Sequence, residues 1–216
     1  MDTIAKAEDA VIIHRIIAGQ TDLFEVLIRR HNALLYKTGR SYNFDHESTQ
    51  DLMQDTFIDA YCNLKKFEER STFRTWLIRI MLNNCYRKKQ KNGYKNEIPQ
   101  HIHEKAIPMF STNNNSDTTR KVLNKEMGRL VETAIQNIPL HYRMVFSLRE
   151  INGFSVEETA GVLHITPTNV KVRLNRAKAL LRNELEKSYS AEDLFEFNLV
   201  YCDAMVKRVM EGINSW

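Results

Sequence analysis

Apolar residues in the first part of the chain recur every three or four positions, a spacing that places them on one face of an α-helix. Between Lys6 and Lys91 such stripes follow one another, for example Met53, Phe57, Ala60 and Leu64, then Phe73, Leu77, Ile80 and Met81. The pattern predicts several helices and no clear strands in this part of the chain.

The periodicity stops after Lys91, in a segment that reads NGYKNEIPQHIHEKAIPMFSTNNNSDTT. Prolines, a run of asparagines and scattered apolar residues without period are typical of a linker. Helical spacing resumes near Arg120 and continues to Glu186. We therefore predict an all-α fold with two helical domains at 1–92 and 121–187, a flexible linker at 93–120, and an amphipathic helical extension at 188–216.

The second domain contains two short helices separated by a tight turn. Ser155 and Glu158 form a capping box, which predicts a helix from Ser155 to about Leu163. Thr166 can cap a second helix, and Pro167 suits its first position because the missing amide is not needed there. Two helices joined by three residues predict a helix-turn-helix, whose second helix enters the major groove of DNA.

The second helix carries cations without acids over most of its length. Val170, Leu174 and Ala177 are spaced to face the domain. The cations on the other sides are Lys171, Arg173, Arg176, Lys178 and Arg182, and no acid follows until Glu184. A solvated helix usually mixes signs to form i,i+4 pairs. Contact with DNA phosphates and base edges therefore explains this helix better than a solvated charged face does.

The first domain carries an acidic stripe, in which Asp51, Asp55 and Asp59 follow one another at i,i+4 beside Gln54. Like charges so placed cost a few tenths of a kcal/mol per pair, so the stripe needs a reason. Two interpretations stay open: a docking face for a basic partner, or a solvated helix. The spacing of a calcium loop is absent, and we predict no metal at these residues.

A basic and aromatic stretch follows, with the sequence KKFEERSTFRTWLIRIMLNNCYRKKQK. Cations for phosphates combined with aromatic rings for unstacked bases are what a single-stranded nucleic-acid site needs. The aromatic candidates are Phe67, Phe73 and Trp76, although core packing is the alternative for Phe73 and Trp76.

Composition excludes several classes of protein. The formal net charge is +4 and matters only because it is clustered. Three cysteines without a Cys-x-x-Cys pair indicate reduced thiols in a cytosolic protein. No apolar run is long enough for a signal peptide or a membrane span. We predict no cofactor, and no catalytic residues, because no carboxylate cluster accompanies the basic helices; a metal at His101, His103 and Glu104 of the linker is disfavoured.

Four segments taken together resemble an alternative sigma factor of the extracytoplasmic-function (ECF) group in the sigma-seventy family. They are DLMQDTF, FRTWLIRIMLNN, IPLHYRMVFSLREINGFSVEETAGVL and TNVKVRLNRAKALLR, in this order across the linker. The resemblance covers about residues 8–187. It implies a bacterial, cytoplasmic, non-enzymatic protein that directs core RNA polymerase to promoter DNA, with an anti-sigma factor as a further partner.

The resemblance also implies roles for residues in the first domain. This domain binds the clamp helices of core RNA polymerase and captures bases of the non-template strand at the minus-ten element. The residues that match the polymerase-binding motif are Asp51, Gln54, Asp55 and Phe57. The loop of residues 67–72 matches the base-capturing loop. The residues that match the support of the melted strand are Arg74, Trp76, Arg79 and Asn83, with Phe67 and Phe73 beside them.

The second domain, by the same resemblance, reads the minus-thirty-five element as duplex. The matching residues are Thr168, Lys171, Val172, Arg173, Asn175, Arg176 and Lys178. Val172 suits a thymine methyl group and Lys171 suits guanine, whereas Arg173 more often packs against the backbone. His164 stands where the family turn often has Gly, a position that favours a left-handed backbone. Asn175 is short for a base contact.

The extension at 188–216 has apolar residues along one helical stripe, including Leu194, Phe197, Tyr201, Met205 and Val209. A face this wide must be covered. It either packs on this chain's own DNA-binding domain, docks a partner such as an anti-sigma factor, or switches between the two. For the whole chain, the alternatives are a stand-alone helix-turn-helix regulator with an N-terminal sensory domain, and an adaptor or anti-sigma antagonist.

Overall fold

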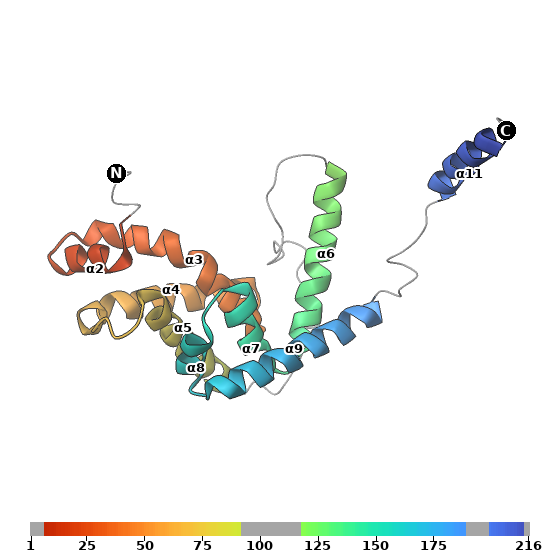
Figure 1. Ribbon diagram of the computed structural model, residues 1–216. Helices are drawn as coiled ribbons and strands as arrows, with labels where there is room; N and C mark the ends of the chain where they lie inside the picture. Colours follow the sequence, from red (N-terminus) through yellow and green to blue (C-terminus); the bar gives the residue numbers. More distant parts are fainter. Residues whose placement is uncertain (1–6, 92–117, 189–198, 214–216) are drawn as a thin grey trace.

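A computed structural model describes residues 7–91, 118–188 and 199–213, and every element within these ranges is helical. The helices are α2 (Asp9–Ile17), α3 (Phe24–Ser41), α4 (His46–Cys62), α5 (Phe73–Lys91), α6 (Thr118–Asn137), α7 (Leu140–Phe146), α8 (Val156–Leu163), α9 (Pro167–Ser188) and α11 (Leu199–Ile213). Short 3-10 turns occur at η1 (Thr21–Leu23) and η2 (Leu64–Lys66), and a π-helical turn at η3 (Ser147–Ile151). The all-α prediction is confirmed (Figure 1).

Helices α2–α5 form the first domain around a core of aliphatic side chains. Leu27 and Leu35 from α3, Leu52 from α4 and Leu77 from α5 are all at most 2% exposed. Each of these helices presents apolar residues at three- and four-residue spacing, so one face of each is buried against its neighbours. The hydrophobic stripes read from the sequence are therefore the core stripes of this domain.

The helix-turn-helix lies at α8 and α9, as predicted. The Ser155 side chain accepts a hydrogen bond from the Glu158 amide at 3.0 Å, and the Glu158 carboxylate accepts one from the Ser155 amide at 2.8 Å. Thr166 caps α9 by accepting from the Asn169 amide at 3.2 Å. His164 between the helices has a φ of +52°, the left-handed backbone expected at that position.

Helix α9 is the scaffold of the second domain, because α6, α7 and α8 all pack against it. Val145 of α7, Ala160 of α8 and Val170 of α9 form a small buried cluster. Helix α6 begins at Thr118, a few residues before the expected domain start, and most of the predicted linker lies outside the described residues. Its flexibility stays a prediction.

The two domains pack directly on each other. Leu148, Phe154 and Val162 of the second domain belong to the same buried cluster as the core of the first. Buried Arg40 of α3 donates to buried Glu132 of α6 through Nε and Nη2, at 2.9 and 2.6 Å. Figure 1 shows α7 and α8 against the first domain. The sequence predicted two helical domains but not this direct contact between them.

Candidate nucleic-acid interface

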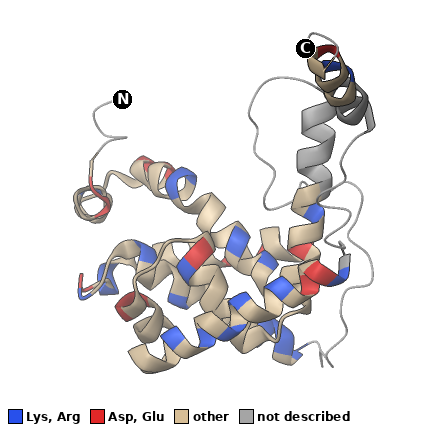
Figure 2. Cartoon of the chain, turned by 45° about the vertical axis from the view of Figure 1, so that its right-hand side comes forward, with Lys and Arg blue, Asp and Glu red and all other residues tan. Residues whose placement is uncertain are grey.

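The cationic side of α9 is exposed while its opposite side is fixed in the domain. Val170 and Ala177 are fully buried, so they set the rotation of the helix. Lys171 and Arg176 are exposed, and Val172 is 44% exposed. Figure 2 shows Lys and Arg recurring along α9. The first three turns of the helix thus present cations and one apolar side chain to solvent.

Other predicted residues of α9 make local contacts that hold their positions. The half-buried Arg173 donates from Nε to Asn169 Oδ1 at 3.0 Å, in keeping with a role along the backbone. Arg176 donates to the Tyr142 hydroxyl at 3.2 Å. Lys178 pairs with Glu150 at 2.9 Å, which partly satisfies its charge. Thr168 and Asn175 are exposed near the start of the helix.

The acidic stripe of α4 borders a groove of about 590 Å³ whose other wall is the basic end of α5. Asp51, Gln54 and Asp55 are exposed. Asp51 lies 3.3 Å from Lys88 Nζ, and Asp59 accepts from the Asn84 amide at 3.0 Å. The repulsion between like charges along α4 is therefore partly offset by α5, and the carboxylates of Asp51 and Asp55 remain exposed.

Phe57 differs from the other predicted polymerase-binding residues, because it is only 7% exposed. Its ring packs edge-to-face on Phe24, with centroids 6.4 Å apart. Its place on α4 puts it among the core positions rather than beside Asp55. The side chain is therefore buried in this conformation, and its predicted contact with a partner stays a prediction.

The aromatic residues near the loop of residues 67–72 form one cluster. Phe67, Phe73 and Trp76 lie with ring centroids 5.3–5.8 Å apart. Phe73 is 2% exposed and also packs on His31, so its predicted contact with a base is not available in this conformation. Phe67 and Trp76 are half-buried and keep part of their surface accessible.

A hollow of about 680 Å³ opens beside this loop, between residues 69–73 and the start of α2. Asp9 lies in its wall, where His31 Nε2 is 2.9 Å away and Arg30 also pairs with it. Burial raises the pKa of Asp9, but the hydrogen bonds and charges of His31 and Arg30 outweigh it, so the net pKa lies below its usual value. These contacts fix one wall of the hollow.

Arg74 and Arg79, predicted to support a melted strand, contact the second domain instead. The Arg74 guanidinium lies 4.0 Å from the centroid of the Phe154 ring. Burial lowers the pKa of Arg74, and Glu158 acts in the opposite direction. Arg79 donates to the Gly161 carbonyl of α8 at 3.3 Å. Asn83, on the next turns of α5, is exposed. In this arrangement the second domain occupies part of the predicted strand-binding surface.

The residues that join the domains were not singled out in the sequence. Besides Arg40 and Glu132, Ser41 Oγ lies 2.7 Å from Ser147 Oγ, and Arg143 donates to Asn43. Burial lowers the pKa of Arg143 to about 10. The sequence does not predict these contacts, because the partners lie far apart in the chain and a polar residue on a helix carries no local pattern that identifies its partner.

Two family models match the chain, and their matched ranges coincide with the two domains. Sigma-70 region 2 matches residues 27–94, and the Sigma-70 region 4 model matches residues 128–181; together they cover more than half of the chain. The chain therefore belongs to the sigma-70 family.

Curated relatives narrow this to the ECF group. An ECF RNA polymerase sigma-E factor of Haemophilus influenzae is 25% identical over 82% of this chain and 95% of its own length. The one from Escherichia coli K12 is 26% identical over 82% and 94%. Both relatives are thus matched along nearly their entire length, which indicates the same two-domain organisation.

Solved structures share the fold. CnrH, in complex with the cytosolic domain of CnrY, gives a TM-score of 0.61 at 23% identity, covering 84% of this chain and 99% of CnrH. The sigma factor RpoE of Bartonella quintana, in complex with the anti-sigma factor NepR, gives 0.59 at 21% identity, covering 76% and 96%.

The described residues contain neither a metal-binding cluster nor a membrane-spanning helix. Within residues 7–91, 118–188 and 199–213, no cluster of His, Cys, Asp and Glu is arranged to hold a metal ion. In the same ranges no helix has the length and apolar character that a membrane span requires. His101, His103 and Glu104 lie outside the described residues. Cys62 and Cys85 are free thiols.

Proposed function

We propose that this protein is a sigma factor that binds core RNA polymerase and directs initiation at specific promoters. Its second domain reads the minus-thirty-five element as duplex, and its first domain holds the opened minus-ten strand. The observation that carries the proposal is α9, which presents Lys171, Val172 and Arg176 to solvent while Val170 and Ala177 fix the helix in the domain. A recognition helix needs this division between a reading side and an anchored side.

The exposed side chains of α9 suit duplex DNA chemically. Lys171 can donate to the acceptors of guanine, and Val172 can contact the methyl group of thymine. Arg176 and Lys178 lie along the helix for phosphate contacts, which set register and orientation. Binding by this helix therefore weakens as salt rises, by about 0.9 log units per log unit of salt for each phosphate neutralised.

The first domain supports the proposal in two ways. The exposed carboxylates of Asp51 and Asp55, with Gln54, offer a docking face for the polymerase clamp helices, supported by buried Phe57. The hollow beside the loop of residues 67–72, with half-buried Phe67 and Trp76 near it, can receive an unpaired base. Stacking on an aromatic ring is worth about 1–3 kcal/mol per base.

The packed conformation is a resting form in this proposal. Arg74 and Arg79 are engaged by Phe154 and Gly161, so they cannot hold a DNA strand at the same time. Polymerase and promoter binding therefore require the second domain to leave α5. An anti-sigma factor is a further expected partner, and it would act by favouring a form of this kind.

Run-off transcription with bacterial core polymerase, with and without this protein, tests the function. We expect new promoter-specific transcripts only when the protein is present. Failure to start any, in a preparation shown to be free of anti-sigma factor, contradicts the proposal. A stand-alone regulator, by contrast, would bind DNA without retaining core polymerase in a pull-down.

Substitutions in α9 test the division of labour. Lys171→Ala and Arg176→Ala should each weaken duplex binding by about 1–3 kcal/mol if they contact bases or phosphates, while polymerase pull-down stays unchanged. Lys187→Ala is the matched control, because it removes the same charge from the far end of the helix, where Lys187 pairs with Glu184. Equal loss in the control, or loss of polymerase binding in the first two, would count against the assignment.

A further inference from the structure

Helix α11 carries an exposed apolar face. The exposed fractions are 48% for Met205, 50% for Val206, 52% for Val209, 49% for Met210 and 59% for Ile213. With about 3.6 residues per turn these side chains share one side of the helix. The charged residues of the same turns, Lys207, Arg208 and Glu211, share the other side. A helix divided in this way normally buries its apolar face against another surface.

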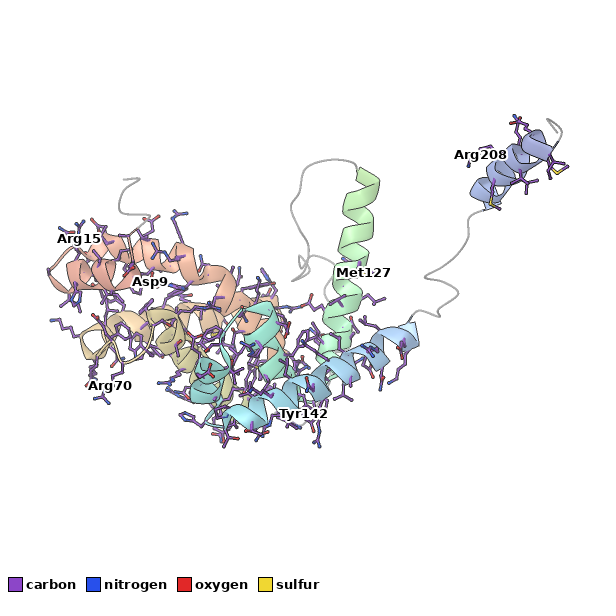
Figure 3. All side chains as sticks on the ribbon, viewed as in Figure 1. Asp9, Arg15, Arg70, Met127, Tyr142 and Arg208 are labelled. Atoms are coloured by element: carbon purple, nitrogen blue, oxygen red, sulfur yellow. The ribbon has the colours of Figure 1, made fainter. Side chains whose placement is uncertain are left out.

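A matching apolar groove lies between α6 and α9. It has a volume of about 390 Å³, and its apolar lining is Met127, Leu130 and Val131 from α6 with Leu181 and Leu185 from α9. The charged residues Lys178, Arg182 and Glu186 of α9 also line it. Met127, labelled on α6 in Figure 3, is 47% exposed although it belongs to this apolar wall. The second domain thus has an unfilled apolar surface near the end of its last helix.

The chain connects these two surfaces over a short distance. Helix α9 ends at Ser188, about one turn beyond Leu185 of the groove, and α11 begins at Leu199. The joining residues, 189–198, can span up to about 35 Å when extended, at about 3.3–3.6 Å per residue. This reach is enough for α11 to return along α9.

We propose that α11 docks in the groove between α6 and α9 of its own chain, with Val209 and Ile213 facing inward. Figures 1 and 3 show α11 apart from α6 and α9, with Arg208 labelled, so the proposal concerns a second position of this helix. An isolated helix of this length is marginal in water, and burial of its apolar face stabilises it.

The short connection through residues 189–198 favours docking of α11 from the same chain over docking of α11 from a second copy. Two surfaces joined by a chain of about ten residues meet at an effective concentration in the millimolar range, about a thousandfold above a micromolar protein solution. A contact of modest strength is therefore formed within the chain before it is formed between chains. Both the groove lining and the exposed face of α11 are apolar, which is what such a contact requires.

Docking would leave the base-reading turns of α9 uncovered. The groove borders Lys178 and the residues after it, whereas Lys171, Val172 and Arg176 lie on earlier turns. The docked helix would extend the apolar core of the second domain beyond the family match, which ends at residue 181. The inference does not depend on the proposed function.

Hydrogen exchange of the full-length protein, read by mass spectrometry on peptides covering 199–213, tests the docking. We expect exchange about tenfold or more slower than in an unstructured chain. Val209→Gln with Ile213→Gln should abolish this protection. Met127→Gln, on the groove side, should do the same. The matched controls are Lys207→Gln with Glu211→Gln, which keep the net charge, and Thr133→Gln, at an exposed position of α6 outside the groove; both should leave the protection intact.

Other occupants of these surfaces give different results. If α11 pairs with a second copy, its protection rises with protein concentration and survives Met127→Gln, and the proposal is overturned. If α11 exchanges at the rate of an unstructured chain in every variant, the helix is free or waits for another protein, and the proposal is overturned as well. Circular dichroism checks that each variant is folded, as expected because all six substituted positions are exposed.

Discussion

At the scale of single residues, the close packing of α3 against α4 and α5 depends on the absence of a side chain at Gly39. A Cβ atom built there would lie 2.7 Å from Thr49 Cγ2 and 3.0 Å from Met81 Cε. Both neighbours are fully buried, so neither side chain can move into solvent. Gly39 therefore lets α3 lie against α4 and α5 at short distance.

We expect Gly39→Ala to destabilise the protein by about 1–3 kcal/mol, the usual cost of overpacking a core. Urea denaturation followed by circular dichroism measures this change. Thr49→Ser removes the Cγ2 atom that would clash, so the double variant should recover part of the loss. A single variant as stable as the parent would show that the helices separate more easily than their packing suggests.

For single residues, the sequence predicted the exposure of charged side chains better than that of aromatic side chains. The periodicity placed Phe57 and Phe73 on apolar stripes, and family motifs assigned them to partners, but both are buried. The exposed cations Lys171 and Arg176 were predicted correctly as exposed, because charged side chains avoid the interior unless paired. Whether an aromatic side chain lies in the core or at a site depends on neighbouring helices, which the local sequence does not specify.

At the scale of elements, the turn of the helix-turn-helix contains a left-handed residue other than glycine. His164 has φ +52° and ψ +46°, and its side chain is exposed. A left-handed backbone costs a residue with a Cβ atom about 1–2 kcal/mol. The turn between α8 and α9 is therefore formed at some cost, which the packing around it must offset.

His164→Gly should stabilise the protein by about 0.5–1 kcal/mol, because relief of the left-handed conformation exceeds the added entropy of glycine in the unfolded chain. His164→Ala is the control: it removes the imidazole but keeps the Cβ atom, and it should give no gain. Thermal unfolding compares the three proteins. Equal stabilisation by both substitutions would attribute the effect to the ring and not to the backbone.

Elements were predictable where a local signal exists. The starts of α8 and α9 follow from Ser155 and Thr166, since capping is a contact between residues three positions apart. The π-helical turn of η3, after which the Asn152 amide donates to the Ser147 carbonyl at 2.9 Å, was not predicted. Such turns depend on packing against other helices.

At the scale of the whole molecule, the contact between domains centres on the Arg40–Glu132 pair. The two residues are 5% and 1% exposed and come from either side of the predicted linker. A charge left without its partner in such a place is strongly unfavourable. The ion pair therefore makes the packed arrangement depend on both members being present.

Glu132→Gln should lower the free energy of unfolding by about 3–5 kcal/mol, or separate the domains, because Arg40 keeps its charge in a buried position. Denaturant unfolding combined with small-angle scattering distinguishes these results. Glu157→Gln, at an exposed position of α8, is the control. Replacing the pair with apolar residues, Arg40→Met with Glu132→Leu, should recover most of the loss. Stability within experimental error of the parent would mean that the pair lies open to water.

The packing of the two domains on each other was the feature least predictable from the sequence. Two helical domains followed from the periodicity and its interruption, and each family region overlaps one of them, with region 2 ending two residues beyond the first. Their contact did not, because Ser41 and Ser147, or Arg40 and Glu132, are about a hundred residues apart and carry no local pattern. Apolar residues such as Phe154 are typical of any core, including a core shared between two domains.

The shared core has a consequence for the energetics of assembly. Leu148, Phe154 and Val162 lose their apolar surroundings when the domains part, at a cost of about 1.5–3 kcal/mol for each side chain that becomes fully exposed. A polymerase that recognises only the parted form meets a small fraction of the molecules, and its apparent affinity falls in proportion to that fraction. Substitutions at these three positions should therefore change how much polymerase is needed for half-maximal transcription.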